Sequence, residues 1–204
     1  MPPGMLQITQ VMIPGDIGDI YLINAPDGTA TLLDCGPVES GETVLMNALE
    51  KRGIMRLEQI IITHQHSDHI GGLPTLLADS AIEIGKILWS PISEETLRKM
   101  VPTEAEQVGR LTRSCVTLAK RRHIPMQAIR VGEVLEFGSG ITGKIIAAAR
   151  PEISVSNYLN NNSIVLRLEY GEFSVLFTVD QGYYEEEFVM ASGADLKSDV
   201  LQTG

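Results

Sequence analysis

The sequence predicts one domain with a mixed α/β fold, and two observations support this prediction. The chain has 204 residues, of which 44% are apolar and 21% are charged, which is enough for one sizeable hydrophobic core. Apolar runs of strand length come first, segments with helical spacing follow, and strand-like runs return near the end. No repeat, low-complexity tract or long linker divides the chain, so we treat residues 1–204 as a single domain.

The first 80 residues are expected to alternate between strands and helices. Two apolar runs, at 20–24 and 30–36, are separated by the turn-like stretch APDGT, which predicts a hairpin. Apolar residues at helical spacing and a basic last turn then predict a helix that stops at Gly53. A β-branched strand at 59–63 leads directly into a histidine-rich segment, and a further helix is expected around 73–78.

A long amphipathic helix is predicted from 104 to 122. Its apolar stripe comprises Val108, Leu111, Cys115 and Leu118, and the stretch from Thr103 to Glu106 resembles a capping box at its start. The remaining segments are predicted as a strand at 144–149, a hairpin over 163–180, a short helix within 182–193 and a last strand at 198–204.

Composition argues against several classes of protein. The 16 basic and 26 acidic residues give a net charge of −10, which disfavours a general polyanion-binding surface. No apolar run approaches the roughly 18 residues that span a bilayer, and the N-terminus lacks the pattern of a signal peptide. Cys35 and Cys115 are too few for a disulfide framework or a cysteine metal cluster, so we expect both to be buried apolar residues.

The segment from Thr63 to Gly72, THQHSDHIGG, contains three of the four histidines of the chain. His64 and His66 can direct both imidazoles toward one point, and Asp68 with His69 can point to a second place nearby. Imidazole and carboxylate are ligands for zinc, manganese or iron, and the lack of a nearby cysteine favours hard or borderline metals. The two closing glycines are expected to let the chain turn sharply. A polar surface loop is the alternative, but four ligand-type residues directly after a buried strand favour a metal site.

The same segment resembles the H-x-H-x-D-H signature of the metallo-β-lactamase superfamily, and the stretch Leu33–Gly36 resembles an earlier motif of that family at a strand end. Asn160–Asp180, with the acidic helix and residues 196–201 that follow, is similar in order and spacing to the metallo-β-lactamase-like domain of ComEC-type competence proteins. Gly15–Asp19 resembles the glycine-rich opening of that branch. The resemblance implies the four-layer αββα sandwich of the metallo-β-lactamase fold, with metals where the strand-end loops meet.

The resemblance also implies a metal site with two positions. The implied ligands are His64, His66, Asp68, His69 and Asp180. The first two would hold one ion, the next two would hold the other, and the last aspartate would bridge them. Asp34 would be a carboxylate that orients ligands, and we assign catalytic roles to Asp34 and Asp68. The expected cofactors are zinc or manganese, one or two ions per chain.

The chain departs from the family pattern in three places. Val179 stands where members commonly carry glycine, next to the bridging aspartate. The usual ligand histidine before the 163–180 hairpin is absent, because His123 lies far away at a predicted helix end; Asn160, Asn161 and Asn162 offer only amide oxygens there. The final family histidine would follow Gly204, so either the chain is a piece of a longer protein or its second metal site is incomplete.

The metal site predicts a hydrolase. Two adjacent cations lower the pKa of bound water to near 7 and stabilise charge on an attacked phosphoryl or carbonyl group. The ComEC resemblance implies a nuclease that acts on single-stranded DNA by a metal-activated hydroxide. The alternatives are a hydrolase of the same fold for a small thioester, lactam or lactone, and a catalytically weak metal-binding or partner-binding domain, which the absent histidines motivate.

Single-stranded DNA is the expected partner, and a window without acidic residues from Gln107 to Gly132 gives this expectation some support. Arg110, Arg113, Lys120 and Arg121 lie opposite the apolar stripe of the predicted helix, where they can follow a phosphate backbone. A solvated helix face is the alternative interpretation, because few aromatic residues are available to stack on bases. We expect a soluble chain, cytoplasmic if it is the whole protein and extracytoplasmic if it is cut from a ComEC-type membrane protein; the sequence predicts no oligomeric state.

Overall fold

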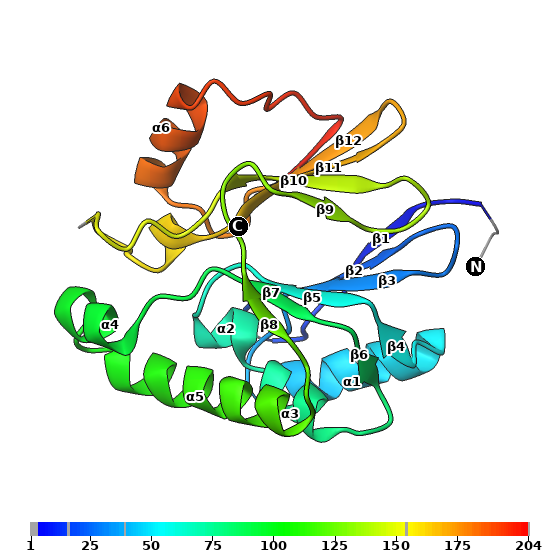
Figure 1. The fold of residues 1–204 in the computed structure, drawn as a ribbon, viewed down its shortest axis with the longest axis horizontal. Helices are drawn as coiled ribbons and strands as arrows, with labels where there is room; N and C mark the ends of the chain where they lie inside the picture. Colours follow the sequence, from blue (N-terminus) through cyan, green and yellow to red (C-terminus); the bar gives the residue numbers. More distant parts are fainter. Residues whose placement is uncertain (1–3, 16, 39, 154, 204) are drawn as a thin grey trace.

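Two sheets lie face to face in the computed structural model of the chain, which describes residues 4–15, 17–38, 40–153 and 155–203 (Figure 1). The first sheet has six strands in the order β1 (Gln7–Gln10), β2 (Tyr21–Asn24), β3 (Ala30–Leu33), β5 (Gln59–Ile62), β7 (Ile87–Trp89) and β8 (Met126–Ala128). The second sheet has five, in the order β13 (Val200–Gln202), β12 (Phe173–Phe177), β11 (Val165–Tyr170), β10 (Thr142–Ala147) and β9 (Val134–Glu136). A separate short pair joins β4 (Arg56–Leu57) to β6 (Glu83–Ile84).

Helices cover the outer face of each sheet (Figure 1). The helices on the side of the first sheet are α1 (Ser40–Arg52), α2 (Ser67–Ile70), α3 (Leu73–Ala78), α4 (Glu94–Met100) and α5 (Ala105–Arg121). On the far side, α6 (Tyr183–Ala191) covers the second sheet. Both sheets combine parallel and antiparallel pairs. The expected four-layer αββα sandwich is therefore confirmed.

The central strands β3 and β5 of the first sheet are buried at every position because both of their faces are covered. In β3, Leu32 packs into the cluster under the helices, while Leu33 packs into the cluster between the two sheets. In β5, Ile60 and Ile61 divide in the same way. Side chains along a strand alternate between its faces, so a strand covered on both sides is largely apolar, and its polar residues Thr31 and Gln59 are hydrogen-bonded to each other.

The ends of these strands bring the predicted site residues to one edge of the sandwich. β3, β5 and β7 are parallel neighbours, so their carboxyl ends lie at the same edge. Asp34 follows the end of β3, and Thr63 follows the end of β5. In the second sheet β12 ends at Phe177, and Asp180 lies in the loop that follows. The ends of β3, β5 and β12 thus meet at the histidine-rich segment.

The structure corrects two expectations about local sequence signals. The expected capping box at Thr103–Glu106 is wrong: Glu104 is the residue before the first turn of α5, and no side chain caps that end. The side chain of Glu104 instead reaches His66, which removes it from any capping role. The two glycines after the histidines have ordinary helical backbone angles, so they are not needed for a sharp turn. A Cβ at Gly71 would lie 2.2 Å from the carbonyl oxygen of Ser67, so close packing requires glycine there.

The predicted long helix is confirmed, with the expected face turned inward. In α5, Val108 and Cys115 are buried, and Leu111 and Leu118 pack against the core beneath the first sheet. Arg122, directly after α5, donates hydrogen bonds to four backbone carbonyls around the end of α3, so it serves the fold. Within the described ranges, no helix is long and apolar enough to cross a membrane.

Candidate metal centre

The histidine-rich segment leaves β5 as an extended chain and then forms the short helix α2. His66 is the residue before the first turn of this helix, and its carbonyl accepts the N–H groups of His69 and Ile70. Gln65 holds the segment in place by two hydrogen bonds. Its side chain accepts the N–H of Ile92 at 2.6 Å and donates to Thr112 of α5 at 2.9 Å. The positions of the histidines are therefore set by the segment before α4, by α5 and by the end of β5.

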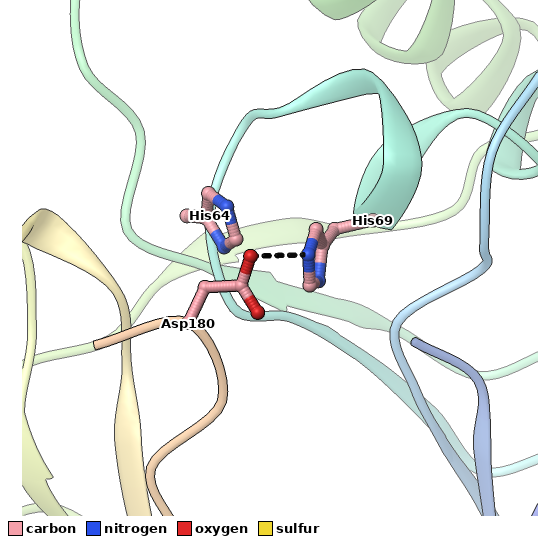
Figure 2. Close-up of side chains that lie close together, drawn as sticks. All are labelled: His64, His69 and Asp180. Atoms are coloured by element: carbon pink, nitrogen blue, oxygen red, sulfur yellow. Dashed lines mark hydrogen bonds and ion pairs between the residues drawn. The ribbon is translucent and has the colours of Figure 1, made fainter. Parts of the chain in front are cut away.

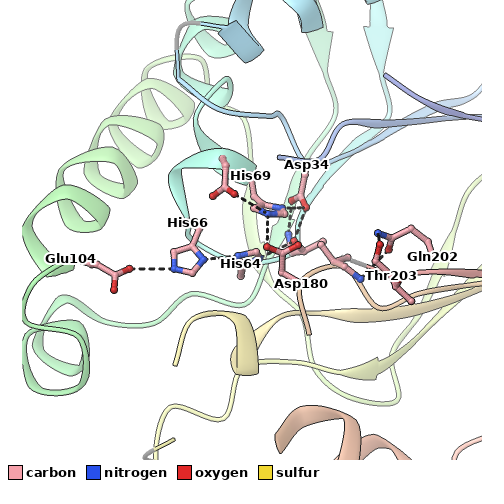
Figure 3. Close-up of polar contacts among 11 residues, drawn as sticks. Asp34, His64, His66, His69, Glu104, Asp180, Gln202 and Thr203 are labelled. Atoms are coloured by element: carbon pink, nitrogen blue, oxygen red, sulfur yellow. Dashed lines mark hydrogen bonds and ion pairs between the residues drawn. The ribbon is translucent and has the colours of Figure 1, made fainter. Parts of the chain in front are cut away.

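Two of the imidazoles face each other directly. His64 Nε2 lies 2.9 Å from His66 Nδ1 (Figure 3). Two nitrogens bound to one tetrahedral zinc ion at about 2.0 Å would be about 3.3 Å apart, so this spacing fits a shared cation with little movement. His64 is buried, and His66 is partly exposed. This pair is the one expected to hold the first ion.

The third imidazole is held by a fully buried carboxylate. His69 Nδ1 lies 2.8 Å from Asp34 Oδ2, and Asp34 also accepts the N–H and the hydroxyl of Thr63, at 2.8 and 2.6 Å. Asp34 has no exposed surface, and its carboxylate contacts Thr63 and His69. It therefore orients His69, the role that the family resemblance implies, and has no surface from which to touch a substrate.

Each of the three imidazoles uses one nitrogen to bond the protein and turns the other toward the centre. His64 Nδ1 lies 3.2 Å from the hydroxyl of Thr63, which itself donates to Asp34. His66 Nε2 lies 3.2 Å from Glu104 Oε2 (Figure 3). We assign the ring protons to these outer nitrogens, because each faces an oxygen that can accept. Histidine ligands of metals are typically oriented by such outer hydrogen bonds.

Carboxylates complete the cluster from the other sheet and from α2. Asp180 Oδ2 lies 3.3 Å from His69 Nε2, and ligand atoms of His64, His69 and Asp180 all lie within 4.8 Å of one another (Figure 2). Asp68 Oδ2 lies 3.7 Å from His69 Nε2. All five residues expected to bind metal thus form one connected cluster at the edge of the two sheets.

Burial and neighbouring charges set the protonation of this cluster. Burial, followed by the positive charges of His69 and His66, lowers the pKa of His64 well below its usual value. Burial would also lower the pKa of His69, but the carboxylates of Asp34 and Asp180 outweigh it and hold that pKa well above its usual value. The hydrogen bond from His69 in turn lowers the pKa of Asp180. Without a cation, His64 is neutral and His69 carries the positive charge that pairs the carboxylates.

A cavity of about 420 Å³ opens beside the cluster. Its lining includes Asp19, Asp68, His69, Asp180 and Thr203. Burial, opposed by the charge of His69, raises the pKa of Asp19 to about 6. Gly18 lets this segment approach, because a Cβ there would lie 2.2 Å from the carbonyl oxygen of Asp68. The side of the cluster formed by Asp68, His69 and Asp180 is therefore accessible through a pocket that also contains the carboxylate of Asp19.

Other residues considered from the sequence lie outside the cluster. His123 is exposed just after α5 and bonds backbone only, as expected for a residue at a helix end. Cys35 and Cys115 are buried free thiols, also as expected. Asp16, within the glycine-rich stretch Gly15–Asp19, and Gly204, at the end of the last expected strand, lie outside the described residues.

The basic face of α5 is only partly available. Arg110, Lys120 and Arg121 are exposed, but Arg113 forms an ion pair with Glu94 of α4. Glu94 also pairs with Arg98. The positive charge expected along this face is thus reduced by one arginine.

Comparison with known proteins shows similarity to one family. The profile of the metallo-beta-lactamase superfamily matches residues 13–87, a range that contains Asp34 and the whole histidine-rich segment. ComE operon protein 3 of Bacillus subtilis is 27% identical over 168 residues, which cover 82% of this chain and 19% of that protein. By this profile match and this relative, the chain is similar to the metallo-β-lactamase superfamily.

Shorter similarities within the superfamily reach enzymes of two reaction types. Hydroxyacylglutathione hydrolase of Stenotrophomonas maltophilia is 33% identical over 90 residues, which cover 44% of this chain and 30% of that protein. Zinc phosphodiesterase ELAC protein 1 of mouse is 40% identical over 62 residues, which cover 30% of this chain and 16% of that protein. The chain thus spans less than a third of the length of each of these relatives.

A solved structure confirms the metallo-β-lactamase fold of the chain. The metallo-β-lactamase fold protein YhfI of Bacillus subtilis superposes with a TM-score of 0.58 at 18% identity, over 97% of this chain and 70% of that one. Three imidazoles with oriented rings and carboxylates within bonding reach are donors that suit divalent zinc or manganese. The residues of this metallo-β-lactamase fold chain therefore fit the metal that the family implies.

Three residues at this centre escaped sequence reasoning. Glu104 and Gln65 hold the histidine-rich segment, and Asp19 lines the cavity. The stretch after Pro102 favours a helix start, so the sequence suggested a capping box there and not a contact between Glu104 and His66. Gln65 stands between the two histidines of the signature, and only that position could have drawn attention to it.

Proposed function

We propose that the chain is a metal-dependent phosphodiester hydrolase that acts on single-stranded DNA. The observation that carries this proposal is the convergence of three oriented imidazoles and the carboxylates of Asp68 and Asp180 beside an open cavity. Bound divalent cations would supply positive charge for the scissile group and acidify water. His64 and His66 would hold one cation, Asp68 and His69 the other, and Asp180 would lie between them.

The protein's own groups have distinct tasks in this proposal. Asp34 keeps His69 in the orientation in which Nε2 faces the centre, and Thr63 does the same for His64 through its hydroxyl. Asp19 sits at the cavity wall with its pKa raised to about 6 by burial, so near neutral pH it can exchange a proton with a group in the cavity. The exposed Arg110 and Lys120 of α5 would attract the DNA backbone.

Similarity to a zinc phosphodiesterase supports phosphodiester chemistry. A second candidate, thioester hydrolysis, is favoured by the similarity to hydroxyacylglutathione hydrolase. Both reactions use the same metal centre, because each passes through a negatively charged intermediate or transition state that cations stabilise. The substrates therefore have to be compared directly.

The test is cleavage of a labelled single-stranded DNA oligonucleotide, bis(p-nitrophenyl) phosphate, a glutathione thioester and a β-lactam, each with manganese and with zinc. We expect cleavage of DNA and of the small phosphodiester, and loss of both when His66→Ala removes a ligand. Thioester turnover without DNA cleavage would replace the proposal with the second candidate. Metal binding without turnover of any substrate would favour a metal-binding domain.

Charge reversal separates a DNA surface from a structural one. Arg110→Glu should reduce DNA cleavage more than hydrolysis of the small phosphodiester, since only a long polyanion reaches α5. Lys144→Glu makes the same charge change at an exposed position of β10, in the other sheet, and is the control. Equal losses for both variants on DNA would show that α5 is not the binding face.

A further inference from the structure

The turn before β11 lies against the metal centre at the position where this chain has asparagines in place of a histidine. The 3-10 turn η1 (Asn160–Asn162) is followed by Ile164, whose N–H bonds the carbonyl of Thr63 at 2.9 Å. Thr63 directly precedes His64. Figures 2 and 3 both draw this yellow turn beside the site.

The loop that carries Asp180 touches the same turn from the other side. Glu185 at the start of α6 donates its N–H to Asn161 Oδ1 at 3.0 Å. A Cβ at Gly182 would lie within 2.6 to 2.9 Å of the Asn161 side chain. The turn is therefore enclosed between the histidine-rich segment and the Asp180 loop, which are the two halves of the metal centre.

Two of the three asparagines are fully committed to holding this turn. Asn161 donates to the carbonyls of Ser156 and Asn157 and accepts from Glu185. Asn162 donates to the carbonyl of Tyr158 and accepts the N–H of Arg150. Their amide oxygens already have a hydrogen-bond donor, and both side chains are buried. Neither is available to a cation without breaking the turn.

Asn160 differs from its neighbours because its amide oxygen is buried and has no hydrogen-bond partner. An oxygen in that state loses its hydration without compensation, which is costly unless a donor or a cation satisfies it. Ser163 Oγ and Gln181 Oε1 are unpaired and buried in the same two segments. The turn, the residue after it and the Asp180 loop thus each contain a buried oxygen without a hydrogen-bond partner.

We propose that Asn160 supplies its amide oxygen Oδ1 as a ligand to the cation held by His64 and His66. This inference rests on the metal centre of the proposed function and adds a ligand to it. An amide oxygen is a harder donor than imidazole, so the substitution favours manganese over zinc at this position. The three asparagines therefore divide into two that build the turn and one that binds the metal.

The test measures metal binding, independently of any substrate. Zinc and manganese affinities are determined by competition with a chromophoric chelator, and the visible spectrum is recorded with cobalt(II) in place of the native ion. Asn160→Ala should weaken binding of one ion at least tenfold, and melting in EDTA should occur at the same temperature or higher, since the unpaired oxygen is gone. Asn160→His should shift selectivity toward zinc by at least tenfold and alter the cobalt bands, because nitrogen replaces oxygen.

Asn24 is a matched control. Its Oδ1 is also buried and unpaired, but the residue ends β2 next to the turn after Ala25, away from the site. Asn24→Ala should leave both affinities and the cobalt spectrum unchanged. Gln181→Ala tests the neighbouring unpaired oxygen: a loss of affinity there, with none in Asn160→Ala, would overturn the assignment.

The outcomes separate this inference from the function on which it rests. Wild-type metal binding with an unchanged Asn160→Ala variant would overturn the ligand alone and leave the proposed hydrolase standing. A wild-type chain that binds no cation would overturn both. Lower melting temperature of Asn160→Ala in EDTA with unchanged affinity would make Asn160 a structural residue like its two neighbours.

Discussion

Glu104 Oε2 lies 3.2 Å from the Nε2 atom of His66, although 38 positions separate the two residues in the chain. The contact joins the start of α5 to the metal centre, and it leaves His66 Nδ1 facing His64 at 2.9 Å. A carboxylate in this position fixes the imidazole and makes it a better ligand. Glu104 would therefore act on a bound metal through His66.

The first prediction is that Glu104→Gln weakens metal binding about 10- to 100-fold. Both partners are partly exposed, so their ion pair contributes about 1 kcal/mol or less to folding, and unfolding in EDTA should hardly change. Chelator competition and urea denaturation measure the two effects. Glu106 is an exposed acidic residue of α5 near Glu104. Glu106→Gln is therefore the control and should change neither the metal affinity nor the stability in EDTA. Equal affinities for both variants would remove Glu104 from the site.

The sequence predicted the site largely through one compact signature, because its ligands are neighbours in the chain. Three histidines and Asp68 follow one strand, so the order of residues alone brings them together. Asp180 could be placed only by resemblance, since its distance from the histidines depends on how two sheets face each other. Glu104 and Asp19 could not be found in this way, because their contacts depend on the packing of α5 and of the segment before β2.

The fold was predicted best where strands and helices carry strong patterns. The hairpins of β2 with β3 and of β11 with β12, and the helix α5, were all expected from periodicity. The short strands β7, β8 and β9 have three residues each, too few for a period to be recognised. Their pairing is decided by neighbouring strands of the finished sheet, so tertiary contacts rather than local sequence define them.

The second prediction concerns Asp34, which is fully buried and accepts hydrogen bonds from Thr63 and His69. Asp34→Ala leaves the Thr63 N–H, its hydroxyl and the charged His69 without their partner, so it should destabilise the metal-free protein by about 3 to 5 kcal/mol. Asp34→Asn keeps the shape and should cost less, while still disturbing His69. Urea denaturation in EDTA ranks the three proteins. A cost below 1 kcal/mol for the alanine variant would contradict the buried network.

The third prediction is a fall in metal-free stability as pH rises above neutral. The carboxylates of Asp34 and Asp180 raise the pKa of His69 in the folded protein well above the unfolded value near 6.5, despite its burial. A raised pKa means that the stabilisation is complete below pH 6.5 and is lost as pH rises through the folded pKa. Melting in EDTA should therefore shift to lower temperature between pH 6.5 and the alkaline range.

Bound metal should oppose this loss of stability. A cation competes with the proton for His69, so its affinity for the site rises as pH rises. The difference in melting temperature between samples with zinc and samples with EDTA should therefore grow with pH over the same interval. Melting curves at several pH values, recorded with and without zinc, measure it. His123 is exposed and lies outside the site, so His123→Gln is the control and should retain both trends. A metal-free protein that becomes more stable with rising pH would be inconsistent with a charged His69.

The last prediction concerns Val179, which is buried in the core between the sheets and has a φ of +49°. A left-handed backbone costs a residue with a side chain about 1 to 2 kcal/mol, and valine is branched at Cβ. Val179→Ala and Val179→Gly both lose the buried side chain, but only glycine also relieves the backbone. The glycine variant should therefore be the more stable of the two by about 1 kcal/mol, after the extra entropy of unfolded glycine is subtracted.

Val175 provides the matched comparison, since it is buried in the same core within β12. In a strand, glycine is less stable than alanine by about 0.5 to 1 kcal/mol, so Val175→Gly should fall below Val175→Ala. Urea denaturation of the four variants in EDTA gives the order of stability of the glycine and alanine variants at each position. The same order at both positions would show that residue 179 is not held in a left-handed conformation. Opposite orders would establish that this chain tolerates backbone strain directly beside Asp180, where superfamily members commonly carry glycine.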